Sequence, residues 1–193
     1  MDEAGGLTLR VLGELDAVRD GVVVELGGRR QRAALAALII ARGDVVSAER
    51  LAECVWGDGA GARHAGGLQS YVSHLRAFLQ PGSGARSRTD VIARIGRGYA
   101  LCLGSLAVDA WRFERILEAA ADLPRSERVL QLGAALDLWR GLPYAEYADE
   151  PWAETEVARL TELRTVAREG LLDARLALGD APLLVPELEA RVV

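Results

Sequence analysis

The chain has 193 residues, half of them apolar and 26% charged, which suits one large or two small globular domains. Its formal net charge of −5 does not by itself favour a nucleic-acid-binding protein. We find no signal peptide, no apolar run of membrane-spanning length and no Cys/His cluster with metal-ligand spacing. Cys54 and Cys102 are predicted to be small core residues. We therefore expect a cytoplasmic protein with no metal and no cofactor.

The charges are unevenly distributed along the chain. Residues 1–104 hold 13 arginines and 11 acidic residues, whereas residues 105–193 hold 10 arginines and 17 acidic residues. Within residues 63–97, six arginines accompany the single acid Asp90. This asymmetry indicates a basic working surface in the first half and an acidic second domain, with a candidate boundary at Gly104-Ser105.

The chain begins with β structure. Apolar and polar residues alternate over residues 7–11, which predicts a half-buried strand. A second strand is expected over 15–19 and a third over 22–26, and the pair Asp20-Gly21 between them is a hairpin turn signal.

A helix rich in Ala and Leu is expected over residues 29–42, with Gly43 as its stop. Arg29, Arg30 and Arg32 crowd its start, where cations oppose the helix dipole. Either a bound anion or a solvated surface cluster accounts for them, and the sequence does not decide between the two.

A second helix is predicted over residues 48–56, with Ser47 as its N-cap. A loop of small residues, 57–62, leads to a longer amphipathic helix over 63–79. The core-facing stripe of that helix, at i, i+3, i+4 and i+7 spacing, consists of Leu68, Tyr71, Val72, Leu75, Phe78 and Leu79.

The outer face of helix 63–79 is small, polar and basic, and it has no carboxylate. Taken alone it fits an ordinary half-buried helix, but it also fits a helix that lies in a DNA major groove. Gly66 and Gly67 each cost roughly 0.5–1 kcal/mol relative to Ala. Either the rigid helix begins later, near Leu68, which is the simpler explanation, or the glycines let the backbone approach a phosphate.

Two short strands are expected over residues 91–95 and 99–103, joined by a tight reversal at Gly96-Arg97-Gly98. Arg97 is predicted at the tip. Strands, three helices and a final hairpin in this order predict an α+β winged helix-turn-helix domain over residues 1–104. In such domains the third helix reads DNA and the hairpin forms the wing.

From Asp109 onward the pattern is entirely helical, which predicts an all-α domain over residues 105–193. Asp109 is expected to cap the first helix, and Pro151 suits the first turn of a long one. The antiparallel pairing resembles tetratricopeptide repeats, although no strict 34-residue repeat is visible. Helices are predicted over residues 109–123, 126–139 and 151–178, with another from about 182 onward.

Specific sequence motifs in both halves resemble a known family. The first half contains LQSYVSHLR and the wing sequence RGYAL, and the second contains LWRGLPY followed by PWAETEVARL. In this order they resemble the OmpR-type winged helix and the bacterial transcriptional activation domain of the Streptomyces antibiotic regulatory protein (SARP) family. The resemblance covers almost the whole chain.

This resemblance implies a transcriptional activator that binds direct repeats at promoters, usually of secondary-metabolite gene clusters, and recruits RNA polymerase holoenzyme. It also allows for a homodimer on DNA. Relatives continue for several helices beyond the position of Val193, so the activation domain is expected to be partial. By position, residues 63–79 are the recognition helix, and the polymerase-contact loop corresponds to Gly57, Asp58, Gly59, Ala60 and Gly61.

Roles in DNA binding can be assigned on chemical grounds. Side chains that pair with base edges are expected at Gln69, Ser73, His74 and Arg76. Contacts with the DNA backbone or the minor groove are expected from Arg29, Arg30, Arg32, Arg63, Ser70, Arg94 and Arg97. For each arginine the alternative is an ordinary surface charge.

Two other functions remain open: a DNA-binding repressor or antagonist, and a scaffold that uses the winged helix for protein contacts. The acid-poor stretch over residues 63–97 argues against the scaffold. An enzyme is not expected, because the sequence has neither a Walker loop nor a GxSxG elbow.

Overall fold

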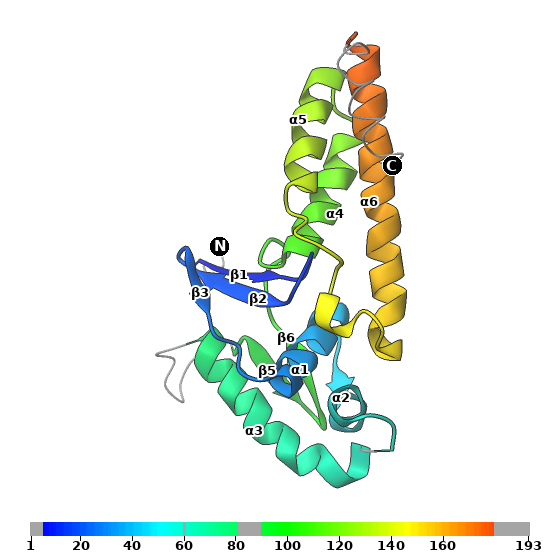
Figure 1. The fold of residues 1–193 in the computed structure, drawn as a ribbon. Coiled ribbons are helices and arrows are strands. Elements are labelled where there is room, and N and C mark those ends of the chain that lie inside the picture. The colour runs from blue at the N-terminus through cyan, green and yellow to red at the C-terminus, as the bar shows by residue number, and fades with distance from the viewer. Residues whose placement is uncertain (1–5, 60, 81–89, 180–193) are drawn as a thin grey trace.

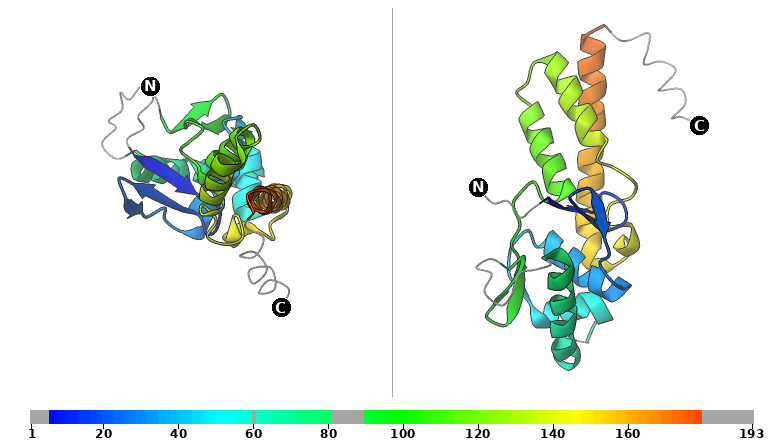
Figure 2. Two further views of the ribbon diagram at one scale, coloured as in Figure 1. Left: turned by 90° about the horizontal axis from the view of Figure 1, so that it is seen from above. Right: turned by 90° about the vertical axis from the view of Figure 1, so that its left-hand side faces the viewer.

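The computed structural model describes residues 6–59, 61–80 and 90–179, with the backbone alone at 61–66. An α+β part contains two small sheets and three helices, and a helical part extends away from it (Figure 1). The far end of the helical part and the helix α3 (Gly61–Leu79) lie at opposite ends of the molecule (Figures 1 and 2). The predicted fold class, a winged helix followed by a helical domain, is confirmed.

The N-terminal sheet is an antiparallel meander of β1 (Leu7–Arg10), β2 (Asp16–Arg19) and β3 (Val22–Val24). Strand alternation buries Leu7 and Leu9 of β1. Across the β1–β2 pair, the Arg10 guanidinium binds both oxygens of the Asp16 carboxylate, at 2.5 and 2.7 Å. The three predicted strands are confirmed, each somewhat shorter than expected.

Helix α1 (Arg29–Ile40) is the central element, because every residue over 33–39 is buried. A short strand, β4 (Val46–Ser47), leads into α2 (Ala48–Trp56). The Ser47 hydroxyl oxygen accepts a hydrogen bond from the Arg50 amide at 3.1 Å, which confirms the predicted N-cap.

The expectation that the third helix begins near Leu68 is wrong. Helix α3 begins at Gly61 and continues through both glycines. A Cβ added at Gly67 would meet only two ring atoms of Trp56, at 3.7 and 3.8 Å, so α2 packs closely against this turn. Tertiary packing of this kind outweighs the low helix propensity of glycine.

The wing is the hairpin of β5 (Ile92–Ile95) and β6 (Gly98–Leu101), and β4 pairs with β6 to complete a three-stranded sheet. The predicted hairpin is therefore confirmed. Gly96 adopts a φ of +58°, as the reversal requires. Gly98 serves a different purpose, because a Cβ there would lie 2.4 Å from the carbonyl oxygen of Val46 on β4.

The helical part consists of α4 (Asp109–Ala120), α5 (Arg125–Leu136), a 3-10 turn η1 (Ala145–Tyr147) and α6 (Pro151–Ala177). Pro151 lies in the first turn of α6, as predicted. Helix α5 packs against both α4 and α6. The helix expected from residue 182 onward lies outside the described residues.

Asp109 does not act as the N-cap of α4, contrary to expectation. It is the first helical residue, and Val108 occupies the cap position. The Asp109 carboxylate instead accepts hydrogen bonds from the backbone amides of Val11, at 2.7 Å, and Leu12, at 3.2 Å. The start of the helical part is thus bonded to the end of β1.

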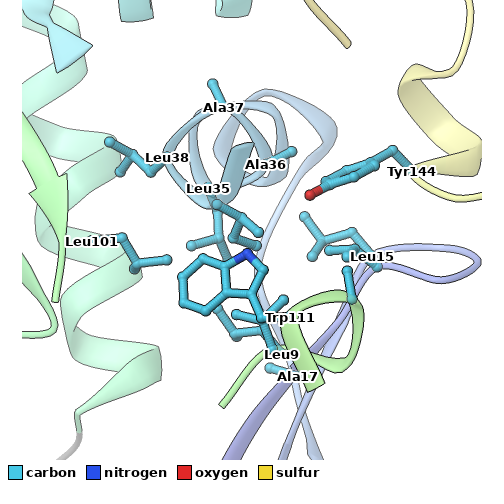
Figure 3. Close-up of a cluster of buried hydrophobic side chains, with 14 of the residues drawn as sticks. Leu9, Leu15, Ala17, Leu35, Ala36, Ala37, Leu38, Leu101, Trp111 and Tyr144 are labelled. Carbon is cyan, nitrogen blue, oxygen red and sulfur yellow. The ribbon is translucent and has the colours of Figure 1, made fainter. Parts of the chain in front are cut away.

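The two parts of the chain share one hydrophobic core. Figure 3 shows Leu9 of β1, Leu35 of α1, Leu101 of β6, Trp111 of α4 and Tyr144 converging on one cluster. The Leu9 amide also donates to the Ala107 carbonyl at 2.7 Å. The expected boundary at residues 104–105 thus falls in a connection whose two sides are packed and hydrogen-bonded together.

Candidate nucleic-acid interface

The outward face of α3 is polar. On the inward side Leu68, Val72, Leu75 and Leu79 are buried in the core. The residues on the opposite side of the helix are exposed to solvent, as the helical period of 3.6 residues requires. Over the part of α3 whose side chains are described, residues 67–79, the exposed side chains suited to hydrogen bonding are Gln69, Ser70, Ser73 and His74.

Side chains of two neighbouring elements, α2 and β2, hold α3 in place. From α2, the Trp56 ring stacks on Tyr71 with centroids 5.4 Å apart and planes 16° apart. From β2, the Arg19 guanidinium donates to the carbonyls of Phe78, at 3.2 Å, and Leu79. These carbonyls lie at the C-terminal end of the helix, where a cation is electrostatically favoured.

Arg76 connects α3 with the wing. Its Nε donates to the Ile92 carbonyl at 2.8 Å, and its Nη2 lies 3.7 Å from an Asp90 carboxylate oxygen. Both contacts turn the guanidinium towards β5, which favours a positioning role over the base contact expected from the sequence. The proposed base-reading set accordingly narrows to Gln69, Ser73 and His74.

His74 has a neighbour on α1. Its Nδ1 lies 3.1 Å from Nε2 of the half-buried Gln31 side chain. The Gln31 side chain also folds back on its own helix start, where its Oε1 accepts a hydrogen bond from the Gly28 amide at 2.8 Å. His74, on the exposed face of α3, therefore contacts a side chain from the first turn of α1.

The two arginines of the wing, Arg94 and Arg97, are both exposed. Within residues 6–59, 67–80 and 90–179, neither guanidinium has an ion-pair or hydrogen-bond partner. The backbone of Arg97 is nevertheless fixed, because its carbonyl accepts a hydrogen bond from the Ala48 amide at the start of α2, at 3.0 Å. The wing thus exposes two arginines that are unpaired among the described side chains, and the backbone of Arg97 is fixed by a hydrogen bond.

The arginines at the start of α1 differ from one another. Arg32 makes a two-pronged ion pair with Glu146, at 2.8 and 2.9 Å, and Arg29 lies 3.1 Å from Glu150. Both partners belong to the helical part, so these two arginines join the two parts of the molecule. Arg30 is exposed and has no such partner among the residues with described side chains. The Arg63 side chain lies outside the described part.

The loop expected to contact polymerase is shorter than the sequence indicated. Gly57, Asp58 and Gly59 are exposed, whereas Gly61 already belongs to α3. Ala60 lies outside the described residues.

The described residues include no group of three or more His, Cys, Asp or Glu that could hold a metal ion. Cys102, expected in the core, is exposed, whereas Cys54 is half-buried and burial raises the pKa of its thiol. None of the described helices is both long and apolar enough to cross a membrane.

Sequence reasoning missed Gln31 and Arg19, which hold α3 from other elements. A signal for Gln31 was present, because Gln at the third helical position is typical of a capping box. Arg19 bonds to carbonyls 59 and 60 residues away in the chain, which no local pattern predicts.

Comparison with known proteins places this arrangement in a family. Residues 23–101 match the family described as "Transcriptional regulatory protein, C terminal", and residues 108–193 match the "Bacterial transcriptional activator domain". The regulatory protein DnrI of Streptomyces peucetius is 30% identical over 191 residues, which span 95% of this chain and 70% of DnrI. The chain belongs to the SARP family of transcriptional regulators.

Other relatives of this family are longer. The regulatory protein AfsR of Streptomyces coelicolor is 34% identical over 98% of this chain, and the match spans only 19% of AfsR. A solved structure of Mycobacterium tuberculosis EmbR, in complex with a low-affinity phosphopeptide, is similar with a TM-score of 0.83 at 30% identity. That match covers 96% of this chain and 49% of EmbR, so the tetratricopeptide-like helical arrangement is shared as well as the winged helix.

Members of this SARP family are regulators of transcription rather than enzymes. The match to the regulatory C-terminal family runs from β3 to β6 and contains α1, α2, α3 and the wing. The activator-domain match begins at Val108, directly before α4.

Proposed function

We propose that this protein binds promoter DNA sequence-specifically and activates transcription by recruiting RNA polymerase. The observation that carries the proposal is the exposed polar face of α3, which lies beside a wing whose two exposed arginines, Arg94 and Arg97, have no ion-pair partner among the described side chains. There is no carboxylate in the sequence between Asp58 and Asp90, so nothing on that stretch repels phosphate.

In this proposal α3 lies in the major groove, where base edges present distinguishable donors and acceptors. Gln69, Ser73 and His74 read bases, and Ser70 contacts a phosphate. Arg94 and Arg97 reach the backbone or the minor groove, where a narrow A·T-rich stretch attracts guanidinium groups.

The arginines at the start of α1 have different proposed roles. Arg30 is available for a phosphate, and Arg63 is proposed as a second backbone contact. Arg29 and Arg32 would first have to leave Glu150 and Glu146, so we assign them to holding the helical part in place.

The helical part is better suited to protein contacts than to DNA. It is rich in acid, and its far end points away from α3 (Figure 1). We propose that it contacts RNA polymerase or a second copy of the chain on promoter direct repeats, and that the loop at Gly57–Gly59 adds a polymerase contact. Secondary-metabolite genes are the proposed targets.

A fluorescence-anisotropy titration against promoter direct repeats tests DNA binding. Wild type should prefer the repeats over scrambled DNA of the same composition. Arg97→Ala should reduce the slope of log K against log salt by about 0.9, as expected for one lost phosphate contact. Arg125→Ala, which removes an exposed arginine from α5, is the matched control and should leave the slope unchanged. Equal affinity for scrambled DNA would contradict the specific-reader proposal.

A run-off transcription assay with purified polymerase tests activation separately. Added protein should increase the transcript from a promoter that carries the repeats, and not from one with scrambled repeats. Selective binding with unchanged or reduced transcript would instead identify a repressor or antagonist.

A further inference from the structure

We propose that Gln31, on α1, is a specificity-determining residue that fixes which ring nitrogen of His74 carries the hydrogen and so restricts the bases that His74 accepts. This inference rests on the proposed function. It adds a contact between α1 and the reading face of α3, made by a residue outside the recognition helix.

The orientation of the Gln31 amide follows from its anchor. Oε1 accepts a hydrogen bond from the Gly28 amide at 2.8 Å, and a backbone N–H can only donate. The Gln31 backbone amide in turn donates to the Gly28 carbonyl at 3.0 Å, which closes a reciprocal pair at the helix start. The space is tight, because a Cβ added at Gly27 would lie 1.9 Å from Oε1. The atom that faces His74 is therefore the Nε2 amino group.

The amide orientation decides the chemistry of the imidazole. An amide nitrogen is a donor only, so at the 3.1 Å separation His74 Nδ1 must be the acceptor. A neutral imidazole has one N–H and one bare nitrogen, and a bare Nδ1 places the hydrogen on Nε2. His74 thus offers an N–H donor at Nε2.

His74 lies at an open part of the surface. His74 is exposed on α3, and a hollow of about 350 Å³ beside it is also lined by residues of α1 and by Tyr71. A donor at this place pairs with guanine N7 or O6, adenine N7 or thymine O4. It cannot pair with the amino group of cytosine, so the base pair read by His74 should disfavour cytosine on the contacted strand.

The first test measures the tautomer in the full chain without DNA. Long-range proton–nitrogen correlation NMR distinguishes the two ring nitrogens, and His64→Gln assigns the spectrum because the chain has only two histidines. Wild type should show hydrogen on Nε2 and a bare Nδ1. Gln31→Glu keeps an acceptor for the Gly28 amide but turns an oxygen towards His74, so Nδ1 should become protonated. A wild-type His74 with hydrogen on Nδ1, or with an even mixture of tautomers, would overturn the inference.

The second test measures base preference by selection from a randomised DNA library. His74→Ala identifies the position that His74 reads. At that position Gln31→Met, which keeps the side-chain length but has no donor, should raise the tolerance for cytosine about fivefold, as expected for one hydrogen bond of ordinary strength. Gln69→Ala, at another exposed position of α3 five residues earlier, should change a different position and leave the His74 tautomer unchanged.

The outcomes separate the two proposals. If Gln31→Met retains the wild-type preference at the His74 position, the inference fails while DNA reading stands. If His74→Ala weakens all sequences equally, His74 contacts phosphate and the base-reading inference also fails. If wild type selects no sequence at all, the proposed function fails, and the NMR result still decides whether Gln31 sets the tautomer.

Discussion

At the scale of single residues, Asp109 connects the two parts of the molecule through buried hydrogen bonds. Its side chain is 4% exposed, and its carboxylate accepts hydrogen bonds from the amides of Val11, Leu12 and Ala110. Burial raises the pKa of this carboxyl above its ordinary value, and the hydrogen bonds and Arg140 offset only part of that rise. A carboxylate that is shielded from water in this way is stable only when hydrogen-bond donors surround it, as the three backbone amides do here.

Replacing Asp109 with Ala should therefore be costly. The amides of Val11 and Leu12 would be left buried without a partner, and the free energy of unfolding should fall by about 2–4 kcal/mol. Urea denaturation followed by circular dichroism measures this change. Glu118→Ala, at an exposed position of the same helix, is the control and should change stability by less than about 0.5 kcal/mol. Equal effects of the two substitutions would show that the Asp109 bonds contribute no stability.

At the scale of secondary-structure elements, two glycines of the α+β part should respond in opposite ways to the same substitution. Gly67 lies in the helical backbone of α3, and a Cβ there would meet Trp56 at ordinary contact distance. Gly67→Ala should raise the free energy of unfolding by roughly 0.5–1 kcal/mol, because alanine loses less backbone entropy in a helix. Thermal denaturation by calorimetry tests this, and a lowered melting temperature would contradict it.

Gly98→Ala should destabilise the wing. The new Cβ would lie 2.4 Å from the Val46 carbonyl oxygen and 2.7 Å from a Val45 methyl group, so β4 would have to move away from β6. We expect a loss of about 1–3 kcal/mol, as for overpacking in a tightly packed site. Hydrogen exchange should accelerate at Tyr99, whose β6 position pairs with Val46. Unchanged exchange there, with the loss spread over the whole chain, would argue against a local effect.

Local sequence patterns predicted most helices and strands, because the hydrophobic periodicity of these elements can be recognised within a few consecutive residues. They failed where tertiary contacts decide the outcome. Glycine propensity suggested a late start for α3, but the helix begins at Gly61, and Trp56 packs against its turn at Gly67. Asp109 looked like a cap, but its partners lie 97 and 98 residues earlier.

Local sequence patterns were also insufficient for the candidate site wherever tertiary contacts decide where a side chain lies. Helical periodicity identified the exposed face of α3, including Gln69, Ser73 and His74. It could not distinguish arginines that face solvent from those that face protein. Arg76 is turned towards Ile92, 16 residues away, and Arg32 towards Glu146, 114 residues away. Such pairs depend on the assembled fold and leave no spacing signal in one sequence.

At the scale of the whole molecule, α1 is held at both ends by acidic residues of the helical part. At its start Arg29 and Arg32 bind Glu150 and Glu146. Just beyond its end, Arg42 binds Glu114 at 2.5 Å and Glu156 at 3.1 Å. Some acidic residues of the second half of the chain are thus paired with arginines of the first half. These ion pairs fix the helical part relative to α1, the helix that supports α3.

The Arg42 end of this connection should be sensitive to pH. Burial opposes the charge of Glu114, but hydrogen bonds from Arg42 and Arg159 outweigh it and lower the pKa of this carboxyl below its ordinary value of 4.5. A lowered folded-state pKa means that the unfolded chain binds the proton more readily. The stabilisation is therefore present above about pH 4.5 and is lost as the pH falls through the folded-state value.

Glu114→Gln isolates this contribution. At pH 7 it should lower the free energy of unfolding by about 1–2 kcal/mol, since it removes a partly buried charge that two guanidinium groups share. The difference between wild type and variant should shrink towards zero as the pH falls from 7 through the folded-state pKa of Glu114, which lies below 4.5, because Glu114 is then protonated in both the folded and unfolded states. Urea denaturation of both proteins across this pH range measures it, with Glu118→Gln as the exposed control. A difference that stays constant with pH would mean that the variant acts through packing, and that charge does not hold this end of α1.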